Sequence, residues 1–181
     1  EGWLLLPASE TEAAQSLHAH RLVLLGEGDG DWPRRRGRRL ELTAELSLEL
    51  RLGREEEIFL HDAALAAVAA WKLGVSPERI AASLEGWAPP PMRLEYSRTP
   101  AGVEILNDAC TSDPHSVEGA LRALVRGLQG PHRSFAVLGG MAQQGPSSQT
   151  AHQRMGARVV ELGVDRLIGV GQGGRGIAQA A

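Results

Sequence analysis

The chain contains 181 residues, of which 43% are hydrophobic and 23% charged, and its formal net charge is −3. This composition is typical of a globular protein and lacks the basic excess that favours nucleic-acid or membrane binding. A single cysteine, Cys110, excludes an internal disulfide, and the lack of an apolar run of roughly 20 residues or of a signal-peptide pattern predicts a cytoplasmic protein.

The first part of the sequence predicts short strands around one helix. Residues 2–7 (GWLLLP) and 21–25 (RLVLL) are apolar runs of the length of buried strands. Residues 10–19 carry a weak helical pattern. Residues 40–52 (LELTAELSLELRL) alternate apolar and polar side chains, which predicts two paired strands with one face in water.

Two helices and a proline-rich connection follow. Residues 58–73 predict a helix with an apolar face made of Ala64, Leu65, Val68 and Trp71. Ser76 stands at an N-cap position and Pro77 at the first position of the next helix. The run at 87–91 (WAPPP) cannot continue a helix and predicts a domain boundary.

Beyond the prolines, a hairpin is expected. Residues 92–96 and 103–106 have the composition of strands, and Thr-Pro-Ala-Gly at 99–102 supplies a turn between them. The apolar side chains of the second strand predict that this strand is buried.

A polar stretch and a capped helix come after this strand. The strand ends on Asn107 and Asp108, and Asp113 occupies an N-cap position before Pro114, the first residue of a helix. Carboxylate, hydroxyl and backbone N–H groups therefore gather at the carboxyl end of a strand. Open α/β sheets bind ligands at such ends.

The rest of the chain alternates strand and helix: a strand at 134–138, a helix at 150–162, a strand at 166–170 and the start of a further helix. Repeated β-α units with short loops predict an α/β fold with a mostly parallel, doubly wound sheet.

Three motifs resemble the Mur ligases, ATP-dependent enzymes of peptidoglycan synthesis. NDACTSDPHS at 107–116 resembles N-D-x-Y-N-A-N-P-D-S of the branch that adds D-alanyl-D-alanine, although the Tyr-Asn-Ala-Asn core is replaced. ALAAVAAWKLGV at 64–75 resembles the family's NALAA helix. LGGMAQQG at 138–145, followed by His152, resembles LGxMxELG…H.

The resemblance implies two domains. Residues 1–90 would be the latter part of a central ATPase-type domain, and residues 91–181 an incomplete Rossmann-like C-terminal domain. The implied reaction joins D-Ala-D-Ala to a UDP-MurNAc-peptide through an acyl phosphate. ATP and Mg would be held by parts of the family fold that this chain lacks, so we expect these 181 residues alone to be inactive. We also expect a monomer. A catalytically silent relative that binds a nucleotide or a partner protein is the alternative.

The resemblance also suggests site residues. Arg93, Asp108 and Asn107 would approach the nucleotide, since a guanidinium suits phosphate oxygens and a carboxylate suits ribose hydroxyls. The alternative for Arg93 and Asp108 is a structural pair that fixes the linker.

Three further residues, Asp113, Ser116 and His152, would lie at the amine substrate. Capping explains Asp113 equally well, and packing explains a lone helical His152. No catalytic residue or metal ligand is identified.

Other patterns have simpler explanations. Lys72, the one lysine of the chain, ends a helix and cannot belong to a P-loop. GVGQGG at 169–174 fits a dinucleotide-binding pattern but needs an acidic residue beyond the chain's end. The arginine-rich run at 34–39 is expected to be a solvated loop, Cys110 a packed residue, and Asp62 an N-cap.

Overall fold

The computed structural model describes residues 4–7, 22–25, 33–53, 56–127 and 133–181. These residues belong to two compact units, Glu1–Ala88 and Pro89–Ala181. The helix expected at 10–19 lies outside the described residues. Among those that are described, no helix is both long and apolar enough to cross a membrane.

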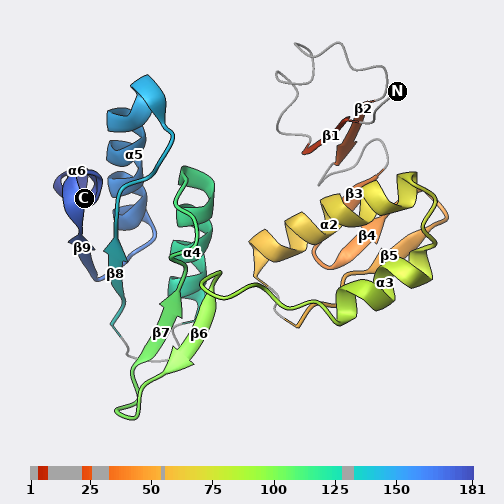
Figure 1. Cartoon of the computed structure of the whole chain (residues 1–181), viewed down its shortest axis with the longest axis horizontal. Coiled ribbons are helices and arrows are strands. Elements are labelled where there is room, and N and C mark those ends of the chain that lie inside the picture. The colour runs from red at the N-terminus through yellow and green to blue at the C-terminus, as the bar shows by residue number, and fades with distance from the viewer. Residues whose placement is uncertain (1–3, 8–21, 26–32, 54–55, 128–132) are drawn as a thin grey trace. The chain divides into compact units, whose positions relative to one another are not determined.

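The described part of the first unit combines a parallel strand pair with an antiparallel sheet and two helices (Figure 1). In the pair, Leu4 of one strand lies opposite Leu22 of the other. Its elements are β1 (Leu4–Pro7), β2 (Leu22–Leu25), β3 (Arg34–Arg36), β4 (Arg39–Glu41), β5 (Ser47–Glu49), α2 (Glu57–Lys72) and α3 (Pro77–Glu85).

The alternating leucines predicted as a strand pair do form the core of this unit. Five of the six leucines between 40 and 52 are less than one tenth exposed, and Leu46 is partly exposed; the five are Leu40, Leu42, Leu48, Leu50 and Leu52. The expected caps of α3 are also present, because the Ser76 side chain accepts a hydrogen bond from the Arg79 N–H and Pro77 is the first helical residue.

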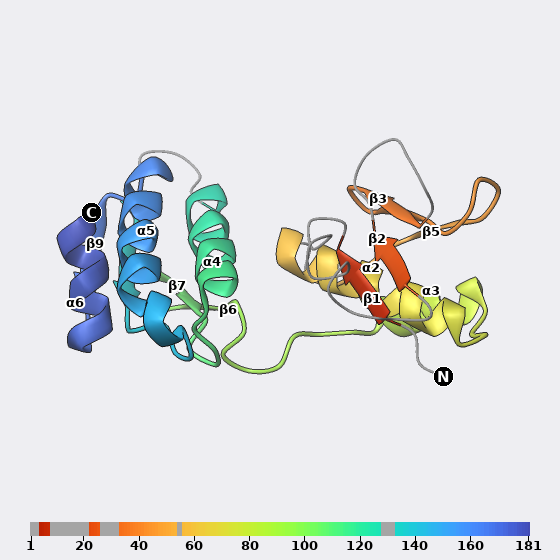
Figure 2. The same ribbon diagram turned by 90° about the horizontal axis from the view of Figure 1, so that it is seen from above.

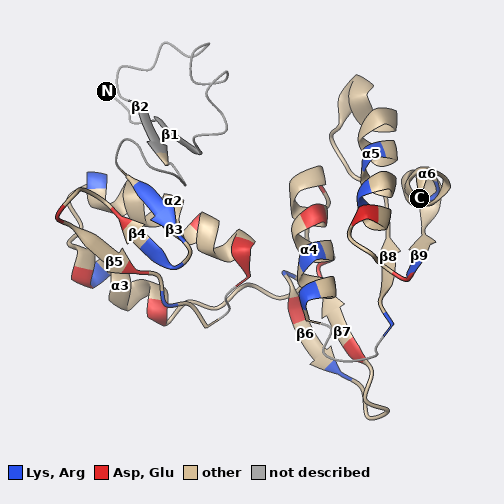
Figure 3. Ribbon diagram, turned by 180° about the vertical axis from the view of Figure 1, so that it is seen from behind, with Lys and Arg blue, Asp and Glu red and all other residues tan. Residues whose placement is uncertain are grey.

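Two expectations for this unit are wrong. The arginine run at 34–39 forms a hairpin, β3–β4, with Gly37 at φ 56° in its turn, and β3 is wholly basic in Figure 3. Arg35 is buried and forms an ion pair with Glu57, which explains why a basic strand can pack inward. Asp62 is an exposed residue inside α2, whose N-cap is Glu56.

The second unit contains a hairpin, a parallel strand pair and three long helices, which lie side by side in Figure 2. Its elements are β6 (Glu95–Arg98), β7 (Glu104–Asn107), α4 (Pro114–Arg126), β8 (Phe135–Leu138), the short helix η2 (Gly145–Ser147), α5 (Ser148–Glu161), β9 (Arg166–Gly169) and α6 (Gly171–Ala180).

The α/β fold class is confirmed, with β8 and β9 pairing in parallel across the α5 crossover. The expected hairpin is confirmed as β6–β7, which pairs antiparallel around a turn with Gly102 at φ 84°. Its burial was predicted wrongly. Val103 and Ile105 are 58% and 44% exposed, because burial of strand side chains requires another element packed on the face of the sheet, which an apolar composition does not guarantee.

The core of the second unit lies between the helices and one face of β8 and β9. It contains Val117, Leu121, Ala136, Met141, Met155, Val159 and Ile177. On the opposite face of the same strands, Phe135, Val137, Ile168 and Val170 are each more than half exposed. The strand pair is therefore covered by described residues on one side.

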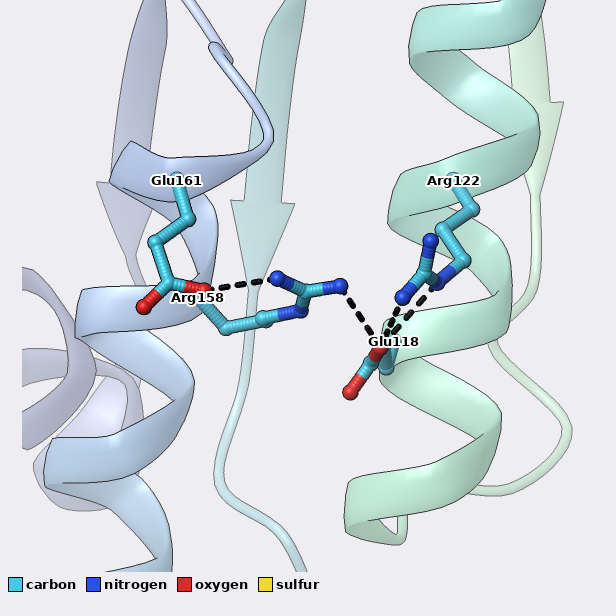
Figure 4. Close-up of polar contacts among 4 residues, drawn as sticks. All are labelled: Glu118, Arg122, Arg158 and Glu161. Carbon is cyan, nitrogen blue, oxygen red and sulfur yellow. Dashed lines mark hydrogen bonds and ion pairs between the residues drawn. The ribbon is translucent and has the colours of Figure 1, made fainter.

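A charged network joins α4 to α5 (Figure 4). Glu118 accepts hydrogen bonds from Arg122 of its own helix at 2.7 Å and pairs with Arg158 of α5 at 3.1 Å. Arg158 also pairs with Glu161. These groups are partly exposed, so the network orients the two helices but contributes modestly to the free energy of folding.

Candidate functional site

Three loops of the second unit meet at the end of β7. The Cys110 N–H donates to the Met92 carbonyl at 3.1 Å, and the Ala142 N–H donates to the Ser112 carbonyl, also at 3.1 Å. The segment before β6, the loop before α4 and the loop after β8 are thereby held together. This junction brings together the segments that carry the motifs at 107–116 and 138–145.

Asp108 stands at this junction as a half-buried carboxylate. Its Oδ1 accepts a hydrogen bond from the Leu94 N–H at 2.9 Å. Burial raises the pKa of Asp108, while the Leu94 hydrogen bond and the nearby charge of Arg93 act in the opposite direction. The structure thus places the Asp108 carboxylate against the backbone of Leu94, the residue after Arg93.

The backbone is strained on both sides of this junction. Met92 and Leu94 have φ values of 60° and 46°, and Gln143, in the loop after β8, has φ 59°. Such values are unusual for residues other than glycine and are concentrated at functional sites and turns. Leu94 is 3% exposed, so burial of its side chain helps to hold the conformation that flanks Arg93.

The other polar side chains between residues 107 and 116 form hydrogen bonds with nearby backbone N–H groups. The Asn107 side chain accepts a hydrogen bond from the Ala109 N–H at 3.3 Å. Asp113 accepts from the Ser116 N–H at 3.1 Å, while the Ser116 hydroxyl accepts from the Asp113 N–H at 3.2 Å. The predicted N-cap is confirmed as a reciprocal capping box. Cys110 is exposed rather than packed.

A cavity of about 1030 Å³ opens between the loop after β8, the first turns of α5 and the length of α6. Among the described residues that line it, Arg175 is the one charged side chain, and four glutamines supply amide groups. The lining consists of Gly140, Met141, Ala142, Ser148, Gln149, His152, Gln153, Gln172, Gly173, Arg175, Gly176, Gln179 and Ala180. The cavity therefore suits a small polar ligand with a negative group.

His152 forms a wall of this cavity from α5 and is 6% exposed. Its Nε2 accepts a hydrogen bond from the Met141 N–H at 2.9 Å. Its Nδ1 lies 2.6 Å from the Ser148 carbonyl oxygen, which can only accept. The ring is therefore neutral with its proton on Nδ1.

The glycines of the GVGQGG motif allow close packing of α6. A Cβ on Gly173 would lie 2.5 Å from the Gly140 Cα, and one on Gly174 would overlap the Leu138 carbonyl oxygen. Contacts between helix and strand explain this spacing of glycines without a dinucleotide.

Arg175 and the four glutamines were not predicted from the sequence as site residues. Gln172 lies in the GVGQGG pattern, which was interpreted through its glycines, and the others carry no motif of their own. For Gln172 and Arg175, the signal that could have found them is that α6 follows a strand directly, which places its first turns at the ligand-binding edge. Among the described residues, no group of three or more His, Cys, Asp or Glu side chains is placed to hold a metal ion.

Comparison with known proteins shows which family the second unit resembles. Residues 92–181 match the family model described as "Mur ligase, glutamate ligase domain". A UDP-N-acetylmuramoyl-tripeptide–D-alanyl-D-alanine ligase of Bacillus subtilis is 36% identical over 119 residues, which are 65% of this chain and 26% of that protein. The enzyme of the same name from Mycobacterium bovis is 37% identical over 131 residues, 69% of this chain and 25% of its own length. The chain thus spans about a quarter of the length of these relatives.

Solved structures give the same picture. A crystal structure of MurF from Acinetobacter baumannii superposes with a TM-score of 0.75 at 26% identity and covers 99% of this chain and 41% of its own. MurF ligase from Thermotoga maritima, solved in complex with ADP, has a TM-score of 0.70 at 20% identity, with 96% of this chain and 41% of that chain covered. At 20% identity, the likeness to the Thermotoga maritima structure shows a shared fold and no more.

Proposed function

The chain belongs to the Mur ligase family through residues 92–181, and from this premise we propose that it is part of a ligase that adds D-alanyl-D-alanine to a peptidoglycan precursor. In this proposal residues 1–90 correspond to the latter part of the central domain and residues 91–181 to the C-terminal domain. The names of the sequence relatives support the reaction. The likeness to MurF over 99% of the chain supports the fold of both parts.

The observation that carries the proposal is the junction at Asp108. A carboxylate and a guanidinium, Asp108 and Arg93, share one electrostatic environment at the end of a strand. Arg93 suits the phosphates of ATP, and Asp108 suits ribose hydroxyls. In this assignment Asn107 shapes the turn that presents Asp108, since its side chain caps the Ala109 N–H.

The adjoining cavity is the proposed seat of the amine substrate. D-Alanyl-D-alanine has one carboxylate and one amide, which match the guanidinium of Arg175 and the glutamine side chains. Ala142 lines the cavity and its N–H donates to the Ser112 carbonyl, so the cavity lies beside the loop that leads to Asp113 and to Ser116 in the first turn of α4. Those two residues then act by fixing the start of α4.

The finer chemistry follows the family. A carboxylate of the UDP-MurNAc-peptide attacks the terminal phosphorus of ATP, and ADP leaves. The amine of the dipeptide then attacks the acyl phosphate, a C–N bond forms, and phosphate departs. We assign no step to Mg, because the described residues show no cluster of three or more ligating side chains that would identify its position.

A catalytically silent relative is the second candidate. It is favoured by Cys110, Thr111 and Ser112, which stand where the Tyr-Asn-Ala of the family's motif is expected. Such a protein would retain the fold and bind a nucleotide or a partner without ligating.

The test is a pair of NMR titrations of the 181-residue chain, with ADP and with D-alanyl-D-alanine. We expect weak binding of both, with shifts near Asp108 for ADP and near Arg175 for the dipeptide. Arg93→Gln should weaken ADP binding alone, and Arg175→Gln dipeptide binding alone, whereas Arg154→Gln, on the exposed side of α5, should change neither. Dipeptide binding that survives Arg175→Gln would contradict the assignment. Binding of ADP without the dipeptide would favour the silent relative.

A further inference from the structure

The imidazole of His152 connects three elements around the cavity. It belongs to α5, accepts the N–H of Met141 in the loop after β8, and lies against Gly173 in the first turn of α6. A Cβ on Gly173 would come within 2.7 Å of Nε2, so that contact leaves no space for a larger residue. Met141 is 5% exposed and belongs to the hydrophobic core.

Both ring nitrogens are engaged within the protein. Nδ1–H donates to the Ser148 carbonyl, and the one lone pair of Nε2 accepts from Met141. A neutral imidazole has no further hydrogen-bonding group. His152 therefore cannot donate to a ligand while these bonds persist, although it lines the cavity.

We propose that His152 is a positioning residue, which holds the Gly140–Met141 turn and the start of α6 in the arrangement that forms the cavity. It acts through the Met141 N–H, and loss of that bond frees one wall of the cavity. The identity of the occupant, a dipeptide, rests on the proposed function; the role of the ring does not.

Two conservative variants separate the two hydrogen bonds. The terminal amide of His152→Gln reaches the position of Nε2 and can accept from Met141. The shorter amide of His152→Asn reaches only the position of Nδ1 and can donate to Ser148. Arg154→Gln, an exposed residue of the same helix, is the control.

The experiment measures thermal unfolding, hydrogen exchange of the Met141 amide, and D-alanyl-D-alanine binding by NMR on the 181-residue chain. A net hydrogen bond corresponds to a change of up to about tenfold, so His152→Asn should accelerate Met141 exchange and weaken dipeptide binding by about that factor. His152→Gln should retain the exchange rate of the Met141 amide and the affinity for the dipeptide. All variants should unfold cooperatively.

Unchanged exchange and binding in His152→Asn would overturn the proposal. Equal loss in His152→Gln and His152→Asn, accompanied by a general loss of stability, would also overturn it, because the ring would then be needed for packing alone. If the unaltered chain binds no dipeptide, the proposed occupant fails, and the difference in Met141 exchange between the two variants still decides the role of His152.

Discussion

The N–H of Leu94 donates a hydrogen bond to Oδ1 of Asp108 at 2.9 Å. This bond joins the segment before β6 to the end of β7, so it closes the open end of the hairpin. It also places a partly desolvated carboxylate next to Arg93, the residue that separates the two positive-φ positions Met92 and Leu94.

Replacement of Asp108 by Asn should leave the protein at least as stable at neutral pH. The amide oxygen can still accept from Leu94, and the cost of burying a charge is removed. Because burial raises the pKa of Asp108 above its ordinary 3.8, the folded state binds its proton more tightly. Stability should therefore fall as pH rises from the ordinary range of an aspartate through the raised value.

Melting temperature against pH for the unaltered chain and Asp108→Asn measures this effect, and the variant should show a flatter curve. Asp108→Ala, which loses the acceptor, should instead cost about 1 kcal/mol. A steeper curve for the Asn variant would contradict the assignment.

Removal of the α4 cap by Asp113→Ala should cost about 1 kcal/mol of the free energy of unfolding. Burial pushes the pKa of Asp113 upward, but hydrogen bonds from Ser116 and His115 outweigh it and hold the pKa below its ordinary value. The contribution is present above the ordinary aspartate range and is lost as pH falls through the lowered pKa. Urea unfolding at neutral and acid pH should show the difference shrinking in acid, with Asp113→Asn closer to the unaltered chain.

Glu118→Gln should destabilise the second unit by less than about 1 kcal/mol, since its partners are partly exposed. Hydrogen bonding from Arg122 lowers the pKa of Glu118, so the effect should vanish in acid, and salt should reduce it. Glu161→Gln, which removes an ion pair within α5 alone, is the matched control. Equal effects of both variants in chemical denaturation would show that no energy couples α4 to α5.

Two glycines of α6 should respond in opposite directions to alanine. A Cβ at Gly174 would overlap the Leu138 carbonyl, which predicts a loss of about 1–3 kcal/mol by overpacking. A Cβ at Gly176 would meet the His152 Cβ at an ordinary 3.7 Å, so Gly176→Ala should gain up to about 1 kcal/mol of helix stability. The unfolding temperatures of the two variants, measured by calorimetry, decide whether close packing requires glycine at 174 and not at 176.

Local chemistry in the sequence predicted the parts of the fold that depend on neighbouring residues. Ser76 with Pro77, and Asp113 with Pro114, identify helix starts because the capping side chain and the N–H it accepts lie within three residues. The turn ending in Gly102 identified the hairpin for the same reason.

Features that depend on distant residues could not be predicted in this way. Val103 and Ile105 have the composition of a buried strand, but their burial depends on what packs against the hairpin. Arg35 is buried because Glu57 lies opposite, and no local pattern reports that pairing. The cavity likewise depends on α5 and α6 meeting around His152.

The side of β8 and β9 on which the described side chains are exposed has a practical consequence. Phe135, Val137, Ile168 and Val170 present contiguous side chains of the kind that drive self-association at high concentration. Light scattering of the chain should therefore rise steeply with concentration, and Val137→Thr with Ile168→Thr, both exposed β-branched replacements, should improve its solubility without unfolding it.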